Sequence, residues 1–134
     1  MSDAPLRRGM TDPGQATVPA PVRLRLGAAL ERLPAPTGER FAELLAHGSL
    51  CVEIYAPEGT DPQQPHDRDE VYVVARGTGT FWNGSERHPF AAGDVLFVPA
   101  GVPHRFEAFT PDFATWVFFF GPKGGEKGRS HALG

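Results

Sequence analysis

Two histidines and one carboxylate stand in a pattern that can bind a divalent metal ion. His66 and Glu70 lie in the segment Gln-Pro-His-Asp-Arg-Asp-Glu, which begins at Gln64, and His104 ends the segment Pro-Ala-Gly-Val-Pro-His. If the backbone is extended, Gln64, His66 and Glu70 project to the same side of a sheet, because side chains alternate between its two faces. Two imidazoles and a carboxylate bind divalent metals and leave coordination positions open for a substrate or for oxygen.

Each of these residues also has a purely structural interpretation. Three charged residues at 67–69 separate His66 from Glu70, so the segment is equally typical of a solvated surface turn. For His104 the alternative is a buried ring that is hydrogen-bonded to the backbone. We favour the metal site because each segment supplies the ligands that the other lacks. The remaining three histidines are assigned no role.

Short segments with a two-residue repeat surround these residues and predict an all-β domain. Leu50, Val52 and Ile54 alternate with more polar side chains, as in a strand with one buried face. Glycine, proline, asparagine and aspartate separate the further segments, which are 70–75, 79–82, 88–90, 95–98, 104–108 and 113–120. Regularly spaced short strands of this kind indicate a sandwich or a barrel.

The last of these segments, 113–120, is apolar on both faces of the pleat. One face is expected to line the core, so something else must cover the other face. The two candidates for this cover are a second copy of the chain and the N-terminal arm. This segment is the basis for predicting a homodimer.

The chain divides into three parts by composition. Residues 1–22 are rich in proline and glycine and poor in large apolar side chains, which predicts a flexible arm. Residues 23–120 form the single predicted domain, which opens with a short helix carrying a leucine stripe at 26–33, ended by Pro34. Residues 121–134 contain many glycines and charges and are expected to be a solvated tail.

Composition also disfavours several classes of partner. The 134 residues are enough for one domain with its own core. The net charge is -3 and the 13 Lys and Arg residues are scattered, which disfavours nucleic acid. No apolar segment is long enough to span a membrane. Cys51 is the single cysteine, so no disulfide forms within the chain, and a reducing cytoplasm is the expected compartment.

Two segments closely resemble the signature motifs of the cupin superfamily. The first is Glu-Val-Tyr-Val-Val-Ala-Arg-Gly at 70–77, preceded by His66 in the place of the second histidine of the family motif. The second is Gly-Asp-Val-Leu-Phe-Val-Pro-Ala-Gly-Val-Pro-His at 93–104. The chain departs from the family at two positions. Gln64 stands where the first metal-binding histidine is usual, and Ala108 stands where asparagine is usual.

The resemblance covers residues 48–120 and implies an antiparallel double-stranded β-helix of the cupin or jelly-roll type, preceded by the short helix and the arm. It also implies one divalent metal ion, which is iron, manganese, nickel or zinc, held by His66, Glu70 and His104. Gln64 offers a neutral oxygen, which is a weaker ligand than imidazole for these metals. We expect Gln64 to bind the metal weakly, to bind it through water, or to contact a substrate instead.

A substrate pocket is expected inside the barrel. Tyr72 lies two residues after Glu70, and Phe106 lies two residues after His104. Because side chains alternate along a strand, both are predicted to point to the interior that holds the metal. Tyr55 is also predicted to face inward, although core packing is an alternative role for Tyr55 and for Glu53. The sequence singles out no catalytic acid or base.

These features predict a metal-dependent enzyme, of dioxygenase, isomerase or lyase type, that acts on a small organic molecule in the barrel. The residues do not choose among the three reactions. The alternative is a non-catalytic module of the same fold that binds or senses a small molecule. In that case a metal, if bound, only orients the ligand.

Overall fold

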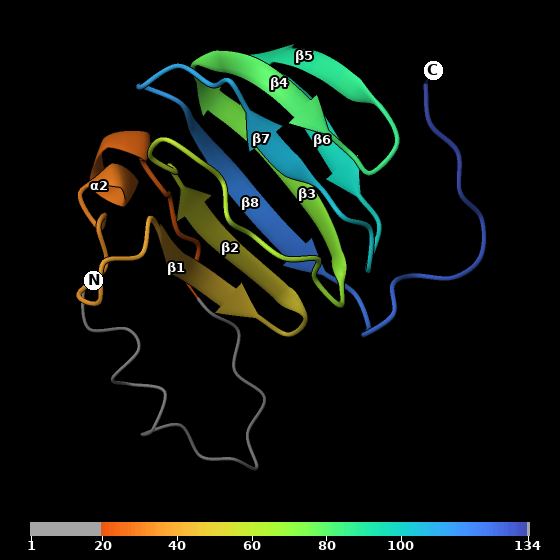
Figure 1. Cartoon of the computed structure of the whole chain (residues 1–134). Helices are drawn as coiled ribbons and strands as arrows, with labels where there is room; N and C mark the ends of the chain where they lie inside the picture. The colour runs from red at the N-terminus through yellow and green to blue at the C-terminus, as the bar shows by residue number, and fades with distance from the viewer. Residues whose placement is uncertain (1–19, 134) are drawn as a thin grey trace.

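The described chain folds into two antiparallel β-sheets and one short helix (Figure 1). The computed structural model describes residues 20–133, so most of the predicted arm at 1–22 lies outside the described residues. The all-β prediction is confirmed. In chain order the elements are α2 (Leu26–Leu30), β1 (Phe41–His47), β2 (Leu50–Tyr55), β3 (Asp69–Arg76), β4 (Thr78–Trp82), β5 (Arg87–Ala91), β6 (Val95–Val98), β7 (Arg105–Glu107) and β8 (Ala114–Phe120).

The two sheets differ in size and enclose the core between them. The larger sheet has five strands in the order β1-β2-β8-β3-β6, and the smaller has three strands in the order β5-β4-β7. The strands pair antiparallel throughout both sheets. The chain passes from the larger sheet to the smaller one between β3 and β4, at Gly77. Two facing sheets of short antiparallel strands agree with the sandwich or barrel that the punctuated sequence predicts, and they form the jelly-roll arrangement that the family resemblance implies.

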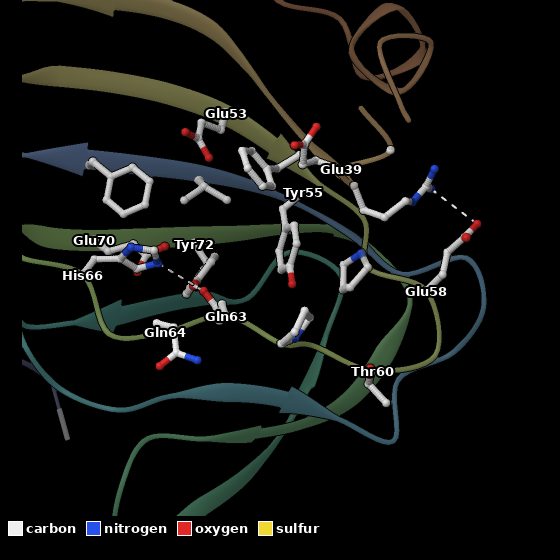
Figure 2. Close-up of a pocket in the computed structure, with 17 residues that line it drawn as sticks. Glu39, Glu53, Tyr55, Glu58, Thr60, Gln63, Gln64, His66, Glu70 and Tyr72 are labelled. Atoms are coloured by element: carbon white, nitrogen blue, oxygen red, sulfur yellow. Dashed lines mark hydrogen bonds and ion pairs between the residues drawn. The ribbon is translucent and has the colours of Figure 1, made fainter. Parts of the chain in front are cut away.

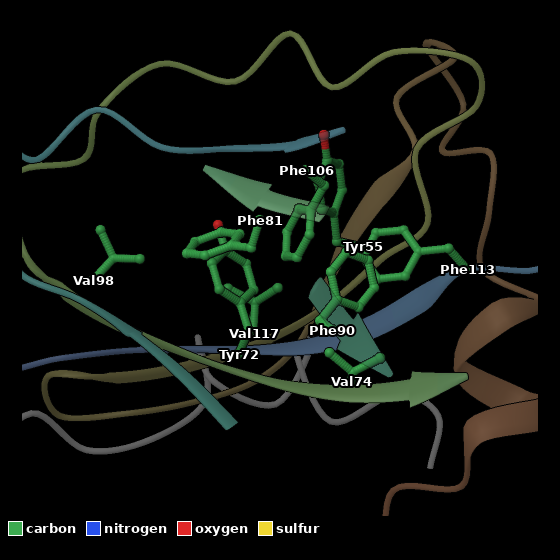
Figure 3. Packing of buried hydrophobic residues seen from close by; sticks show 9 residues of the cluster. All are labelled: Tyr55, Tyr72, Val74, Phe81, Phe90, Val98, Phe106, Phe113 and Val117. Carbon is green, nitrogen blue, oxygen red and sulfur yellow. The ribbon is translucent and has the colours of Figure 1, made fainter. Parts of the chain in front are cut away.

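Aromatic side chains fill the space between the sheets (Figure 3). The ring of Phe106, in β7, lies with its centroid 5.0 Å from Phe81, 5.4 Å from Phe90 and 4.7 Å from Phe113. Tyr72 of β3 approaches Phe106 edge-on at 4.8 Å. All five side chains are at most 3% exposed. Burial of these rings, in offset and edge-on contacts, stabilises the core and holds β7 against β3.

The outer face of the larger sheet is apolar as well. Within β8, Val117 points to the core, whereas Trp116 and Phe118 line a shallow groove on the opposite face. Val22 and Leu24 line the same groove. The segment leading into α2 therefore covers part of this face, and the N-terminal arm is one of the two covers that the sequence suggests.

Two elements differ from the sequence prediction. Strand β1 is not among the predicted strands, because its pairing with β2 shifts register between Glu43 and Leu45 and the apolar side chains lose their even alternation. Helix α2 spans Leu26–Leu30 and so takes up only the first part of the leucine stripe at 26–33. The described part of the chain contains no helix that is long and apolar enough to cross a membrane.

The segment after β8 is anchored at its beginning. The backbone N–H of Gly124 donates to the carbonyl of Asp67 at 2.7 Å, and that of Glu126 donates to the carboxylate of Asp69 at 2.8 Å. Residues 126–133 are exposed. The first part of the segment predicted as a solvated tail is thus tied to the loop that enters β3.

Gly77 joins the two sheets and leaves no room for a side chain. Its φ is +93°, a backbone conformation that glycine adopts at little cost. A Cβ at this position would lie 2.6 Å from the Cα of Phe113 and 2.8 Å from the hydroxyl oxygen of Thr110. Gly38 has a similar φ of +97°, but no atom lies within 4 Å of the position that its Cβ would take. A substitution at Gly38 therefore meets the backbone strain without the steric overlap.

We expect Gly77→Ala to lower the free energy of unfolding by about 2–4 kcal/mol, because the strained φ and the overlap with Phe113 add together. Gly38→Ala meets only the first cost and should lose about 1–2 kcal/mol. Urea denaturation of the two variants and the wild type measures both values. Equal losses in the two variants would contradict the close approach at Gly77.

Candidate metal centre

His66, Glu70 and His104 come from three different parts of the fold and meet at one point. Glu70 is the second residue of β3, His104 directly precedes β7, and His66 lies in the loop between β2 and β3. One potential ligand atom from each residue can be chosen so that all three lie within 4.8 Å of one another. The three residues that the sequence singles out as metal ligands are therefore brought together.

Glu70 and His104 face each other inside the protein. Glu70 is 1% exposed and His104 is 3% exposed, and Oε1 of Glu70 lies 3.1 Å from Nε2 of His104. The other ring nitrogen, Nδ1, lies 2.8 Å from the carbonyl oxygen of Val102. A carbonyl only accepts, so Nδ1 carries the proton of the neutral ring. The lone pair of Nε2 then points at the carboxylate, and the two groups need a proton or a cation between them.

The Glu70 carboxylate is the strongest sign that a positive charge belongs here. Its Oε1 is buried and has no hydrogen-bond partner with acceptable geometry. Burial by itself lowers the pKa of His104, but the Glu70 and Val102 contacts outweigh it and raise the pKa. An unpaired buried carboxylate costs several kcal/mol, which a divalent cation at this point would offset. Two imidazoles and a carboxylate are ligands that suit such a cation.

His66 reaches the same point from the solvent side. Its side chain is 35% exposed, and its Nε2 lies 3.9 Å from Oε1 of Glu70. The ring of Phe119 packs edge-on against the His66 ring, with 4.8 Å between the centroids. The backbone carbonyl of His66 accepts the N–H of Gly101 at 2.7 Å. These contacts hold the loop residue next to the ends of β3 and β8 although it lies outside any strand.

The two glutamines before His66 have different environments (Figure 2). Gln64, which the sequence places at the fourth ligand position, is exposed, and its amide is directed away from His66. Gln63 is half-buried, and its Oε1 lies 3.3 Å from Nε2 of His66 and accepts the Tyr72 hydroxyl at 3.0 Å. Residues 56–68 form an irregular loop, so the alternation assumed for Gln64 does not apply there.

A cavity of about 620 Å³ opens beside these residues. Tyr55 and Tyr72 line it, as the sequence predicts for a substrate pocket, and so do His66 and Glu70. The sequence also places Phe106 in the pocket, but the structure places it in the aromatic core, 1% exposed and outside the cavity lining. The alternation of side chains along the strand predicts only that Phe106 points inward. Its packing against neighbouring rings decides which part of the interior it occupies.

Asp61 connects the loop at 56–68 to both sheets. No sequence pattern identifies this residue. It is 3% exposed. Its carboxylate accepts the Tyr55 hydroxyl, the side-chain amide of Gln63 at 2.6 Å and the backbone N–H of Phe106 at 2.8 Å. Burial and the bond to Asp61 raise the pKa of Tyr55 far above its ordinary range, so its hydroxyl stays protonated.

Glu53 is another of the glutamates that line the cavity. It faces Glu43 across the β1-β2 pair, and the thiol of Cys51 lies 4.0 Å from its Oε2. Burial raises the pKa of Glu53 to about 7, and the negative charges of Glu70 and Glu43 add to the shift. Burial raises the pKa of Cys51 to about 11, and the negative charges of Glu43 and Glu53 add to this shift, so the thiol is not activated.

Comparison with known proteins connects this geometry to a family. The sequence profile of the Cupin domain family matches residues 51–120. The uncharacterized protein SCO3923 of Streptomyces coelicolor is 35% identical over 96 residues, which are 70% of this chain and 91% of that protein. Acireductone dioxygenase 1 of Pectobacterium atrosepticum is 33% identical over 103 residues, which are 72% of this chain and 60% of the relative, so much of that protein has no counterpart here.

A solved structure gives the same fold. The cupin 2 conserved barrel domain protein from Leptotrichia buccalis superposes with a TM-score of 0.53 at 22% sequence identity. The match covers 60% of this chain and 40% of the other.

The raised pKa of Glu53 makes stability depend on pH. Its folded-state pKa of about 7 lies above the ordinary value of 4.5, so the folded protein holds this proton more tightly than the unfolded chain. That contribution is present below about pH 4.5 and is lost as the pH rises through 7. In chelator-treated protein, Glu53→Gln should raise Tm by about 3–5 °C at pH 8 and leave it nearly unchanged at pH 4.5.

Thermal unfolding followed by circular dichroism at the two pH values measures this difference. Glu58→Gln is the matched control, because the Glu58 side chain is 75% exposed and the change should move Tm by no more than about 1 °C. A Glu53→Gln effect of the same size at both pH values would show that ionisation is not its cause.

Proposed function

The chain belongs to the cupin family, and on that premise we propose that it is a metal-dependent enzyme acting on a small organic molecule in the cavity beside His66, Glu70 and His104. The observation that carries the proposal is the buried, unpartnered Oε1 of Glu70. It faces a histidine lone pair, a third ligand reaches the same point, and a cavity opens next to them. A purely structural cluster would pair its carboxylate internally.

The three residues would hold iron, manganese, nickel or zinc, and each of these metals accepts imidazole and carboxylate ligands. When bound, a metal of this class polarises a substrate oxygen, and a redox-active one also permits electron transfer between an organic substrate and dioxygen. The cavity is lined by two of these three residues, His66 and Glu70. The substrate would therefore approach through the cavity rather than through the aromatic core.

The rest of the cavity binds and orients the substrate. Phe41, Val117 and Phe119 provide apolar surface that displaces water from a bound molecule. Glu53, with a pKa of about 7, can hold or release a proton at the cavity wall near neutral pH. Arg40 also lines the cavity, but its guanidinium donates to the carbonyl of Ala56 at 2.9 Å and lies 3.7 Å from the carboxylate of Glu58, so it is not a free cation.

Among the candidate reactions we favour a dioxygenase-like one on an enol or activated ring. Support comes from the ligand set with open positions and from the likeness to acireductone dioxygenase 1. The match spans 60% of the length of that dioxygenase. Isomerase-like and lyase-like reactions use the same polarised oxygen without consuming dioxygen. A non-catalytic module that binds or senses a small molecule is the alternative outside enzyme chemistry.

The test is to purify the untagged protein without chelator, measure bound metals by plasma mass spectrometry, and screen enols and activated aromatic acids with an oxygen electrode. We expect near-stoichiometric metal and substrate-dependent oxygen uptake. Glu70→Gln removes the anionic ligand, so it should lower metal content by at least about tenfold and abolish turnover. Glu31→Gln makes the same chemical change on an exposed side chain outside the cavity lining and should leave both unaffected.

Substrate conversion without oxygen uptake would replace the dioxygenase reaction with an isomerase or lyase reaction. Binding of a ligand without conversion would favour the binding module. Failure to retain any metal, even after reconstitution with all four, would overturn the enzyme proposal.

We also propose that the chain forms a homodimer through the free edge and outer face of the larger sheet. Strand β6 is an edge strand of that sheet. It exposes Val95 and Phe97, which are 65% and 54% exposed. Burying two neighbouring apolar side chains next to an unpaired strand edge stabilises an association between copies.

Phe97→Glu should convert the dimer to a monomer, because a charge on this apolar strand edge would be desolvated on association. Size-exclusion chromatography with light scattering measures the mass. Leu133→Glu changes an equally apolar but fully exposed residue outside the sheets and should leave the mass unchanged. A monomeric wild type would overturn the proposal directly.

A further inference from the structure

We infer that the side-chain oxygen of Gln63, and not that of Gln64, is the fourth protein ligand of the metal. This inference rests on the proposed function, because it assumes that a metal binds to His66, Glu70 and His104. It concerns a residue that no sequence motif identifies. The family pattern points to position 64, and the structure points to its neighbour.

The position of Gln63 Oε1 suits a ligand. It lies 3.3 Å from Nε2 of His66. Neighbouring ligands around an octahedral ion with bonds of about 2.1 Å are separated by about 3 Å. The facing atoms of Glu70 and His104, at 3.1 Å, have the same kind of spacing. The Gln63 oxygen thus stands at the distance from a ligand nitrogen that adjacent positions of one coordination sphere require.

Tyr72 ties Gln63 to the opposite side of the same site. The Tyr72 hydroxyl lies 3.0 Å from Oε1 of Gln63 and 3.0 Å from Nε2 of His104. The glutamine oxygen is therefore linked to both histidines, to one directly and to the other through a single hydroxyl. Gln64 has no comparable place in the site, since its side chain is exposed and turned away from His66 (Figure 2).

The orientation of the Gln63 amide is set by Asp61. The Gln63 Nε2 donates to Oδ2 of Asp61 at 2.6 Å, and an ionised carboxylate can only accept. The amide cannot turn around without placing its oxygen against that carboxylate. Oε1 must therefore face the histidines. Asp61 is itself held by the backbone N–H of Phe106 at 2.8 Å, so the oxygen is aimed at the site before any metal arrives.

An amide oxygen in this position also affects which metal the site prefers. Replacing a nitrogen ligand by a neutral oxygen weakens binding of nickel and zinc more than binding of manganese or ferrous iron, because oxygen is the harder ligand. Glu70 remains the anionic ligand of the set. The donors are then two nitrogens and two oxygens, which favours Mn²⁺ and Fe²⁺ relative to a site with three histidines.

The test compares two adjacent glutamines. Mn²⁺ binding to the full-length protein is measured by isothermal titration calorimetry for the wild type, Gln63→Leu and Gln64→Leu. Gln63→Leu should weaken Mn²⁺ binding by about 10–100-fold. Gln64→Leu makes the identical change one residue away and should stay within about twofold of the wild type. Thermal unfolding in the presence of a chelator shows whether each variant is folded.

Gln63→Met, which keeps the length of the side chain without its oxygen, is the second variant if the branched leucine disturbs folding, and the same loss is expected. Wild-type affinity in folded Gln63→Leu or Gln63→Met would overturn the inference while leaving the three-residue site intact. A loss confined to Gln64→Leu would assign the ligand to Gln64 instead. If the wild type itself binds no Mn²⁺, Fe²⁺, Ni²⁺ or Zn²⁺, the proposed function fails together with this inference.

Discussion

A buried carboxylate oxygen and a buried imidazole nitrogen that face each other at 3.1 Å need a positive charge between them. This constraint arises because the carbonyl of Val102 takes the only proton of the neutral His104 ring. It leaves Oε1 of Glu70 without a hydrogen bond in an interior where an unpaired charge is costly. Both residues are buried, Glu70 within β3 and His104 directly before β7, so neither side chain can relieve the conflict by turning to solvent. A proton or a bound cation between them satisfies both groups at once.

The loop between β2 and β3 completes the site from outside the sheets. It carries His66 and Gln63, and Asp61 fastens it at three places. The Tyr55 hydroxyl connects Asp61 to β2, the backbone N–H of Phe106 connects it to β7, and the Gln63 amide connects it to the site. A single buried carboxylate thus joins the two sheets to the loop. The irregular segment gains the rigidity that a ligand-bearing element needs.

The cavity and the metal site share their electrostatics. Glu53 and Glu70 both line the cavity, and the negative charge of Glu70 makes it harder for Glu53 to ionise, which contributes to the raised pKa of Glu53. A divalent cation bound beside Glu70 would reduce this repulsion. If the proposed metal binds, the protonation of Glu53 and the occupancy of the site would therefore be coupled through space.

The sequence alone determines those features that depend on local periodicity and turn chemistry. The alternation along β3 puts Tyr72 and Glu70 on one interior face, and the punctuated short segments predict the all-β fold and all strands but β1, whose bulge between Glu43 and Leu45 removes the alternation. Only the tertiary structure decides which glutamine faces the site, and that Phe106 packs in the core. These outcomes depend on Asp61 bonding to a backbone N–H 45 residues away, and contacts between such distant residues leave no periodic trace in the sequence.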